Sequence, residues 1–293
     1  MDIAVFGGSF DPPHVGHVKI IKEAIKTLEV EKIFIVPTYL NPFKTKSYAD
    51  AQTRFEWLHV IFKPYKNVEI LDYEILQNKK VPTMETIEYL DSIYDLDKIY
   101  LIMGADNFLH VSSWYRYEAL KERVIFVIAS RDNIDIPKNL KKLSINATIS
   151  SSKLRENMNI AFIPKNIENE IKMHYARKKM EERIGRIVAI LDEKKAENIQ
   201  VFDMSKKDYF VEQVVLATTL GDKHGFALLD HLKTQLKEQG ENFLGIDAEG
   251  EWVVVDMGDI LIHLMTPAYR SRYNLEDFLA HRDEEMRKAM PTE

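Results

Sequence analysis

The chain contains no cysteine among its 293 residues, and it lacks any long apolar run. Without cysteine, disulfides and thiolate metal sites are excluded, and a cytoplasmic location is the expected one. A membrane-spanning helix needs about eighteen or more consecutive apolar residues, so we expect no part of the chain to cross a membrane. Residues 2–6 already have the pattern of a strand, with no basic segment or small-residue cleavage site before them, so we expect no secretion signal.

A strong excess of one charge is absent from the first part of the chain but present in the second. Residues 1–183 carry 27 Lys and Arg against 25 Asp and Glu, a balance of +2, and residues 184–293 carry 13 against 21, a balance of −8. The first part can therefore host an anionic substrate in a local basic site. The second part would be repelled by nucleic acid phosphates, so a ribonucleoprotein partner should be met through a basic protein.

The first part of the chain alternates short β-branched apolar runs with helical patterns, which predicts an α/β fold with a doubly wound parallel sheet. Strands are expected at Ile3–Phe6, Lys32–Pro37, Val68–Leu71, Ile99–Gly104 and Val124–Ala129. Helices are expected at Val18–Leu28, Thr53–Phe62, Thr86–Ser92 and Tyr117–Lys121.

Residues 166–183 are polar and charged, without glycine or proline, which predicts a helix that closes a first domain at residues 1–180 and runs into a linker. Residues 184–293 are then predicted to form a second, smaller α/β domain with a mixed sheet. Its elements are expected to be helices at Ile184–Lys195, Phe210–Leu220, Lys223–Glu238 and Leu275–Met290 and strands at Ile199–Asp203, Glu251–Asp256 and Ile260–Met265. The last two strands should pair antiparallel, because the residues that join them, 257–259, contain the glycine and aspartate of a hairpin turn.

The segment Gly7–His17 follows the first expected strand and opens the first expected helix. Glycines at a strand end let backbone N–H groups approach a polyphosphate, and a helix N-terminus adds partial positive charge. His14 and His17 lie three residues apart on one face of the first turn, where two imidazoles can donate hydrogen bonds to a reacting phosphate. Taken separately, a Gly-Gly pair is often an ordinary turn and two histidines can be metal ligands, but no third ligand is visible nearby.

The second segment of this kind is Ile149–Arg155, which contains three serines, a lysine and an arginine. Serines before a helix-prone stretch are ordinary N-caps. Hydroxyl groups with a lysine and an arginine on the first helical turn also form a good cradle for a departing pyrophosphate.

Together, the two segments resemble the nucleotidylyltransferase superfamily, whose marks are a histidine–x–glycine–histidine motif and a serine-rich motif that ends in arginine. The finer resemblance is to bacterial nicotinate-nucleotide adenylyltransferase over residues 1–180. It rests on Gly7–His17, on Pro37–Lys44, on Gly104–Asn107 followed by Trp114, and on Ile149–Arg155. The resemblance implies a Rossmann-like sheet and an Mg²⁺-dependent transfer of the adenylyl group of ATP to nicotinate mononucleotide, giving nicotinate adenine dinucleotide and pyrophosphate.

The resemblance also implies site residues. The ATP-binding residues would be Gly7, Gly8, Ser9, Phe10, His14, His17, Asp106, Ser151, Ser152 and Arg155, of which His14, His17 and Arg155 would be catalytic. The mononucleotide-binding residues would be Ser9, Lys44, Thr83, Thr86 and Trp114, with Trp114 stacked near the nicotinate ring. No protein metal site is expected, because Mg²⁺ would be held through the ATP phosphates.

The chain departs from the pattern of the family in two places. Phe43 stands where many members have a histidine before the lysine, so a phosphate contact is lost there. Residues 82–84, Pro-Thr-Met, replace the usual Ser-Tyr-Thr of the pyridine pocket, which changes the side chains available there. Trp114 also has a plain alternative interpretation as a core or interface residue.

The second half looks like the ribosomal silencing factor (Iojap-like) family over about residues 184–279. The residues that carry this resemblance are Asp203, Met204, Gly250–Met265, Arg270, Tyr273, Leu275 and Glu276. The resemblance implies a domain without a catalytic centre that binds the large ribosomal subunit through protein uL14, blocks subunit joining and can form a homodimer. Trp252, Met265 and Tyr273 are the expected ribosome-binding anchors, although strand residues must also fill a core. Asp256 and His263 could instead form an internal hydrogen-bonded pair.

Two other functions stay open from the sequence. The first domain could be an adenylyltransferase for nicotinamide mononucleotide or phosphopantetheine, or a degenerate scaffold beside a ribosome-binding domain. The enzyme hypothesis requires the glycines and histidines of Gly7–His17 to converge with residues 151–155 around one triphosphate. Functional coupling of the two domains is not indicated by any residue, so we expect fusion without allostery.

Overall fold

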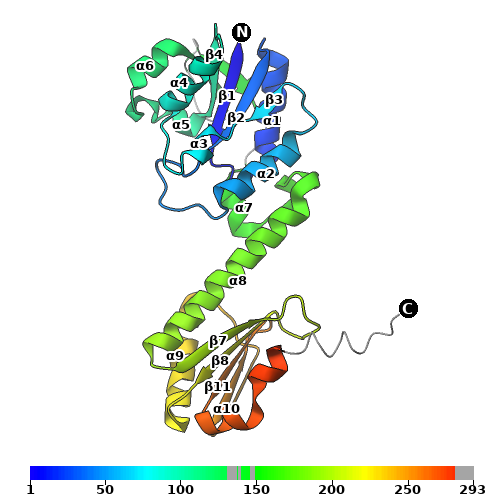
Figure 1. Cartoon of the computed structure of the whole chain (residues 1–293), viewed down its shortest axis with the longest axis vertical. Coiled ribbons are helices and arrows are strands. Elements are labelled where there is room, and N and C mark those ends of the chain that lie inside the picture. The colour runs from blue at the N-terminus through cyan, green and yellow to red at the C-terminus, as the bar shows by residue number, and fades with distance from the viewer. Residues whose placement is uncertain (131–136, 138–139, 146–148, 281–293) are drawn as a thin grey trace, which may run out of the picture. The chain divides into compact units, whose positions relative to one another are not determined.

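The computed structural model describes residues 1–130, 137, 140–145 and 149–280. The chain divides into two compact units, which we call unit 1 (Met1–Lys178) and unit 2 (Lys179–Glu293). Figure 1 shows the chain coloured from blue at the N-terminus to red at the C-terminus. In the described parts of the chain, no helix combines the length and the apolar character needed to cross a membrane.

Unit 1 is built on a six-stranded sheet whose strand order is β3-β2-β1-β4-β5-β6. Its strands are β1 (Ile3–Gly8), β2 (Lys32–Pro37), β3 (Val68–Ile70), β4 (Ile99–Gly104), β5 (Val124–Ser130) and β6 (Lys141–Ser144). Every neighbouring pair is parallel, so the predicted doubly wound sheet is confirmed, and β6 is a strand that the sequence did not reveal.

Helices cover both faces of this sheet and enclose two hydrophobic cores (Figure 1). The longer ones are α1 (Val15–Thr27), α2 (Ala51–Phe62), α4 (Thr83–Ile93) and α6 (Tyr117–Arg123). The shorter ones are α3 (Tyr73–Leu76), α5 (Ala105–Phe108), η1 (Val111–Ser113), α7 (Ser151–Asn157), η2 (Ile160–Phe162) and η3 (Lys165–Ile167). One core contains residues of α1, α2 and the start of α8, and the other contains residues of α4 and α6.

The strand order reverses direction between β1 and β4, which pair in parallel from Ile3 opposite Ile99 to Phe6 opposite Ile102. Ligands of open α/β sheets bind beyond the carboxyl ends of the strands at such a switch point. Gly7 and Gly8 end β1 there, and Gly104 ends β4. The topology therefore places the glycine-rich segment at the expected binding edge.

Helix α8 (Glu168–Glu193) is continuous across the boundary between the two units. The prediction of a helix that ends in a linker, followed by a separate helix from residue 184, was wrong. Gly185 is the only potential breaker in this stretch, and its φ is not positive, while a Cβ added there would meet nothing within 4 Å. A single glycine lowers helix propensity but does not end a helix that is otherwise well supported.

Unit 2 has a five-stranded mixed sheet in the order β7-β8-β11-β10-β9. Its strands are β7 (Glu197–Asp203), β8 (Gln213–Thr218), β9 (Gly245–Glu249), β10 (Trp252–Asp256) and β11 (Ile260–Met265), and its helices besides α8 are α9 (Asp222–Glu238) and α10 (Pro267–Tyr273). Only β8 and β11 pair in parallel among these neighbours, and β10 and β11 form the predicted antiparallel pair.

The helix predicted at Phe210–Leu220 was wrong, because this segment contains strand β8. β8 lies between β7 and β11, and all but its first residue are buried. A short apolar run covered on both faces has no alternation, so periodicity cannot distinguish it from a buried helix. The helix predicted at the end of the chain is present over residues 275–280, and its remainder to Met290 lies outside the described residues.

Candidate active site at the switch point

The turn from β1 into α1 fixes the orientation of both predicted histidines. His14 is the N-cap of α1, and its Nδ1 accepts a hydrogen bond from the Gly16 amide at 3.1 Å. The Nδ1 of His17 accepts from the His14 amide at 3.1 Å, which completes a capping box. Because both Nδ1 atoms accept, the neutral imidazoles carry their protons on Nε2. The backbone thus presets both rings as Nε2–H donors.

The two imidazoles stack, with ring centroids 3.7 Å apart and an interplanar angle of 20°. Glycine is needed beside them for lack of space, since a Cβ on Gly16 would lie 2.9 Å from the His14 ring. A Cβ on Gly8 would similarly lie 3.1 Å from the ring of Phe10, which is buried and packs edge-on against His17. The buried Phe10 ring therefore packs against His17, so only the backbone of Phe10 is available to a phosphate.

Helix α7, which is distant in sequence from the turn between β1 and α1, contacts this turn. The hydroxyl of Ser151 donates to the Pro12 carbonyl at 2.9 Å, and the Arg155 guanidinium donates to the Asp11 carbonyl. Arg155 also donates to the Ser152 hydroxyl at 3.1 Å and lies 4.5 Å from the ring centre of Tyr48. The two segments quoted from the sequence therefore lie side by side in space.

A buried polar network holds this arrangement. The Asp11 carboxylate, 2% exposed, accepts from the amides of Tyr48 and Ala49 and from the hydroxyl of Tyr175 on α8. Arg54, 1% exposed, donates to four backbone carbonyls on the loops after β1 and β2 and before α2. Because their partners are loop backbone groups and the Tyr175 hydroxyl, the buried side chains of Asp11 and Arg54 position the site and do not face a substrate.

The cavity at this point has a volume of about 320 Å³ and holds most of the predicted phosphate-handling residues. It is lined, among others, by Gly7, Gly8, Ser9, Phe10, His14, His17, Lys44, Asp106, Ser151 and Ser152. Arg155 does not line it and lies behind Ser152. Lys44 Nζ lies 3.5 Å from the Ser9 hydroxyl, and burial, with the nearby charge of Arg155, lowers the pKa of Lys44. An anion bound here would relieve that repulsion.

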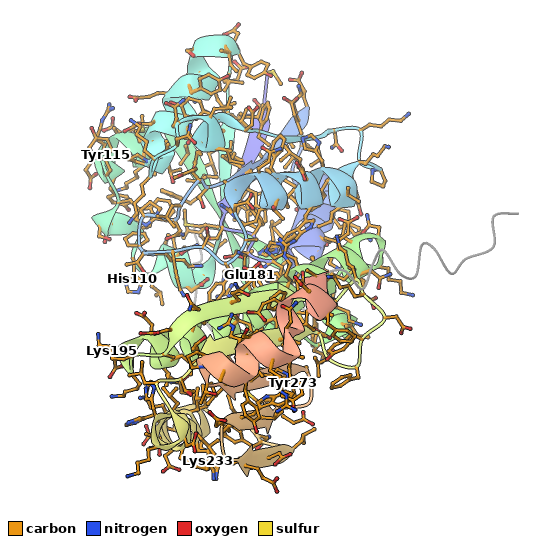
Figure 2. The ribbon with its side chains drawn as sticks, turned by 60° about the horizontal axis from the view of Figure 1, so that its bottom comes forward. His110, Tyr115, Glu181, Lys195, Lys233 and Tyr273 are labelled. Atoms are coloured by element: carbon orange, nitrogen blue, oxygen red, sulfur yellow. The ribbon has the colours of Figure 1, made fainter. Side chains whose placement is uncertain are left out.

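A second cavity of about 290 Å³ lies beside the first and has largely apolar walls. Trp114, at the end of η1, lines it together with Thr83 and Thr86 of α4. Figure 2 labels Tyr115, which also lines this cavity, and His110 along the same edge of unit 1. The predicted mononucleotide residues are thus divided: Ser9 and Lys44 line the first cavity, and the other three line the second.

Thr86 is 1% exposed, and its hydroxyl donates to the Glu74 carboxylate at 2.8 Å. A direct hydroxyl contact from Thr86 to a substrate is therefore not available in this arrangement. Glu74 is itself buried in the wall of the second cavity, and burial raises its pKa to about 7.

Asn41 and Asn107 join Gly7 and Gly8 as residues that line both cavities, although neither asparagine was singled out for a role. Asn41 precedes a proline after β2, which is a turn signal at a strand's carboxyl end. Arg54 had a clearer signal, because it lies on the same helical face as the apolar Trp57, Leu58 and Ile61. In the described ranges, no group of three His, Asp or Glu side chains could hold a metal ion.

In unit 2, the three expected anchors differ in exposure. Trp252 is half-buried, and its indole Nε1 donates to His263 Nδ1 at 3.1 Å, so His263 pairs with Trp252 and not with Asp256. Burial lowers the pKa of His263 to about 4. Tyr273, labelled on α10 in Figure 2, is 45% exposed and lies 5.0 Å from the Trp252 ring centre. Met265 is fully buried, so its prediction as a surface anchor needs correction: it fills the interior.

The parallel sheet, the glycine turn and the histidine pair at its switch point define a nucleotide-binding α/β transferase. The family model described as Cytidylyltransferase-like matches residues 5–157, and the chain belongs to this family. The model described as Ribosomal silencing factor during starvation matches residues 177–292. Both families suggested by the sequence are thereby confirmed, and unit 1 is a nucleotidyltransferase.

Individual relatives narrow the class further. The "Probable nicotinate-nucleotide adenylyltransferase" of Sulfurimonas denitrificans is 50% identical over 169 residues, which are 58% of this chain and 92% of that protein. The protein of the same name from Campylobacter fetus is 45% identical over 178 residues, which are 61% of this chain and 98% of that protein. A solved structure, Plasmodium falciparum nicotinic acid mononucleotide adenylyltransferase complexed with NaAD, covers 61% of this chain and 97% of its own at 18% identity and a TM-score of 0.50, and it shares the fold.

Proposed function

We propose that unit 1 transfers the adenylyl group of ATP to nicotinate mononucleotide, releasing pyrophosphate. One observation carries this proposal: the β1–α1 turn and the start of α7 meet around a single cavity that contains two preset imidazole donors and the Lys44 ammonium. The names of the relatives from Sulfurimonas denitrificans and Campylobacter fetus support the choice of substrates.

In this proposal, a phosphate oxygen of the mononucleotide attacks the α-phosphorus of ATP, and the bond to the β-phosphate oxygen breaks. The nucleophile is already ionised at neutral pH, so no general base is required, and catalysis consists of positioning and charge stabilisation. The Nε2–H groups of His14 and His17 would donate to the ATP phosphates. Gly7, Gly8 and Ser9 would contribute close backbone contacts.

The remaining roles follow the walls of the two cavities. Ser151 and Ser152 would hold the β- and γ-phosphates, with Arg155 contributing its charge from behind Ser152, and Asp106 would contact a ribose. In the second cavity, Trp114 would stack on the pyridine ring beside Thr83.

Mg²⁺ would enter with the triphosphate and neutralise part of its charge. Mg²⁺ at nucleotide sites is commonly held by phosphate oxygens, so the protein would not need to supply a carboxylate cage.

A substrate panel tests the proposal. The full chain is incubated with Mg²⁺·ATP and either nicotinate mononucleotide, nicotinamide mononucleotide or phosphopantetheine, and pyrophosphate release and the adenylylated product are measured. Dinucleotide formation with nicotinate mononucleotide as the preferred substrate is expected. Preference for either other acceptor would reassign the enzyme, and absence of transfer to all three would favour the degenerate scaffold.

We further propose that unit 2 binds the large ribosomal subunit through protein uL14 and blocks subunit joining. The match to the silencing-factor family supports ribosome binding, and the −8 balance of residues 184–293 suits a basic ribosomal protein. Trp252 and Tyr273 are the proposed anchors, since they form one partly exposed aromatic pair. ATP and ribosomes share the bacterial cytoplasm, so this pair of functions would place the chain there.

Co-sedimentation of the full chain with purified large or small subunits tests this second function. We expect the full chain to bind the large subunit. We expect this binding to be lost when Tyr273 is changed to Ala, and when the large subunit has been stripped of uL14. Binding that survives removal of uL14 would reject this route of attachment. A homodimer through unit 2 stays a prediction, which sedimentation equilibrium measures directly.

A further inference from the structure

Among the described residues, two in the wall of the second cavity can carry a charge at neutral pH, Glu74 and Lys80. The remaining walls are apolar or neutral, including Trp114, Pro82 and Met103. Glu74 is buried in this wall, whereas Lys80 is exposed, so Lys80 can favour a ligand mainly through a direct charge-assisted hydrogen bond. The balance between these two residues therefore decides which ring substituent the cavity favours.

Glu74 contributes less than a full negative charge to this balance. Glu74 is only 5% exposed. Its Oε1 accepts from the Thr86 hydroxyl, and its buried Oε2 has no hydrogen-bond partner among the described residues. Burial and the nearby charge of Glu85 favour the protonated form and raise the pKa of Glu74 to about 7. Near neutral pH, a substantial fraction of this carboxyl is uncharged.

Lys80 has no acidic partner among the residues that the structure describes. Its Nζ donates one hydrogen bond, to the Pro42 carbonyl at 2.9 Å, and it forms no ion pair with any residue that the structure describes. Thr83, close to Lys80 in the same wall, begins α4, whose N-cap Pro82 makes no side-chain capping bond. A helix start of this kind adds partial positive charge. The polar part of the wall is therefore net positive.

We infer that Lys80 is a specificity-determining residue, whose ammonium selects a mononucleotide with a carboxylate on its aromatic ring over one with a carboxamide. This inference rests on the proposed function of unit 1. An anionic ring substituent gains a charge-assisted hydrogen bond from Lys80, whereas a neutral amide gains only a weak one. The hydrogen bond from Lys80 to the Pro42 carbonyl fixes the ammonium beside another residue of the same wall, and Trp114 lines that cavity as well.

The alternative role for Lys80 is structural, because its bond to Pro42 ties the segment before α4 to the loop after β2. A tie of this kind would affect all acceptors equally, since it changes the shape of the cavity and not its charge. The two roles therefore differ in the ratio between substrates.

The test compares Lys80→Met, which keeps an unbranched apolar chain without the charge, with Lys80→Arg and with the matched control Lys79→Met. Lys79 and Lys80 are both exposed, and only Lys80 lines the cavity. The ratio of kcat/KM for nicotinate mononucleotide to that for nicotinamide mononucleotide should fall roughly 5- to 30-fold in Lys80→Met, and the change should lie in KM. This effect lies between the contribution of an exposed ion pair and that of a hydrogen bond to a charged group. Lys80→Arg and Lys79→Met should keep the wild-type ratio.

An equal loss for both substrates in Lys80→Met, or an unchanged ratio, would overturn the inference. Equilibrium binding of each mononucleotide, followed by tryptophan fluorescence, separates this outcome from failure of the proposed function. A wild-type chain that transfers no adenylyl group would reject the proposed reaction. Binding would still decide the role of Lys80, since loss of the preference for the carboxylate in Lys80→Met supports it and retention contradicts it.

Discussion

His14 and His17 illustrate how backbone geometry prepares a side chain for chemistry. Their Nδ1 atoms accept from amides of their own helix start, so each neutral ring carries its proton on Nε2 without having to change tautomer. Preorganised donors of this kind contribute most where charge develops in the transition state, because no reorganisation is needed during the reaction.

We therefore expect His17→Ala to lower kcat by roughly 10²- to 10³-fold, the usual effect of removing one preorganised donor. Steady-state pyrophosphate release at saturating substrates measures it. His59→Ala is the matched control, because His59 is exposed on α2 and lines neither cavity. A kcat within threefold of the wild type would remove His17 from the chemistry.

Glu74 predicts a pH dependence of stability. Its pKa is raised from 4.5 to about 7 in the folded chain, so between these values the folded state holds a proton that the unfolded state has lost. Stability from this group is complete below about pH 4.5 and is lost as the pH rises through 7. At about 1.4 kcal/mol per pKa unit, the loss is of the order of 3 kcal/mol.

Glu74→Gln should remove this dependence, so its free energy of unfolding should exceed that of the wild type at pH 8 by more than at pH 5. Urea unfolding at both pH values, followed by tryptophan fluorescence, measures the difference. Glu122→Gln, an exposed change on α6, serves as the control. Parallel pH profiles for Glu74→Gln and the wild type would contradict the burial argument.

Among the elements, α8 contributes to two hydrophobic cores, one in each unit. Tyr175 lies in the core of unit 1 and holds Asp11 through its hydroxyl. Ile187 lies in the core of unit 2, and Arg183 pairs with Glu241 and Asp259. The polar sequence of this helix is explained by its narrow buried face, since its other residues are mostly exposed.

Tyr175→Phe should destabilise unit 1 by about 1.5–3 kcal/mol, the range for a hydrogen bond to a charged group. The ring remains, so packing against Trp57 is kept while Asp11 loses one of its three donors. Urea unfolding measures the loss, and Tyr65→Phe, which removes a hydroxyl for which no hydrogen bond is found in the described residues, is the control. Equal stability of Tyr175→Phe and the wild type would show that the Asp11 bond contributes nothing.

At the scale of the whole molecule, the described hydrophobic clusters separate by unit: two lie within unit 1 and two within unit 2. Allostery requires alternative states that both ligands bias, and although α8 contributes to a core in each unit, no residue indicates a second state of this helix. We therefore expect purified large ribosomal subunits to leave the rate of adenylyl transfer unchanged. The rate is measured with saturating large subunits and with small subunits as the control, and a change specific to the large subunit would demonstrate coupling.

Much of the fold follows from the sequence, because strongly periodic segments predict helices and β-branched apolar runs predict strands. All five strands predicted in unit 1 are present, and so is the hairpin of β10 and β11. β8 was mistaken for a helix because a doubly covered strand carries no alternation. β6 and β9 escaped notice because strands at a sheet edge are short and partly exposed, so they lack a continuous apolar run.

The sequence by itself determined the class of chemistry, since the glycines, the two histidines and the serine-rich segment can be recognised without knowledge of the fold. Only the tertiary structure decided which residues meet. Arg155 donates to Ser152 and does not line the first cavity, and the Thr86 hydroxyl donates to Glu74. Met265 is buried, and Lys80 and Trp114 line the same apolar cavity. The physical reason is that burial and charge at a site depend on segments distant in the chain, and local patterns do not contain those distances.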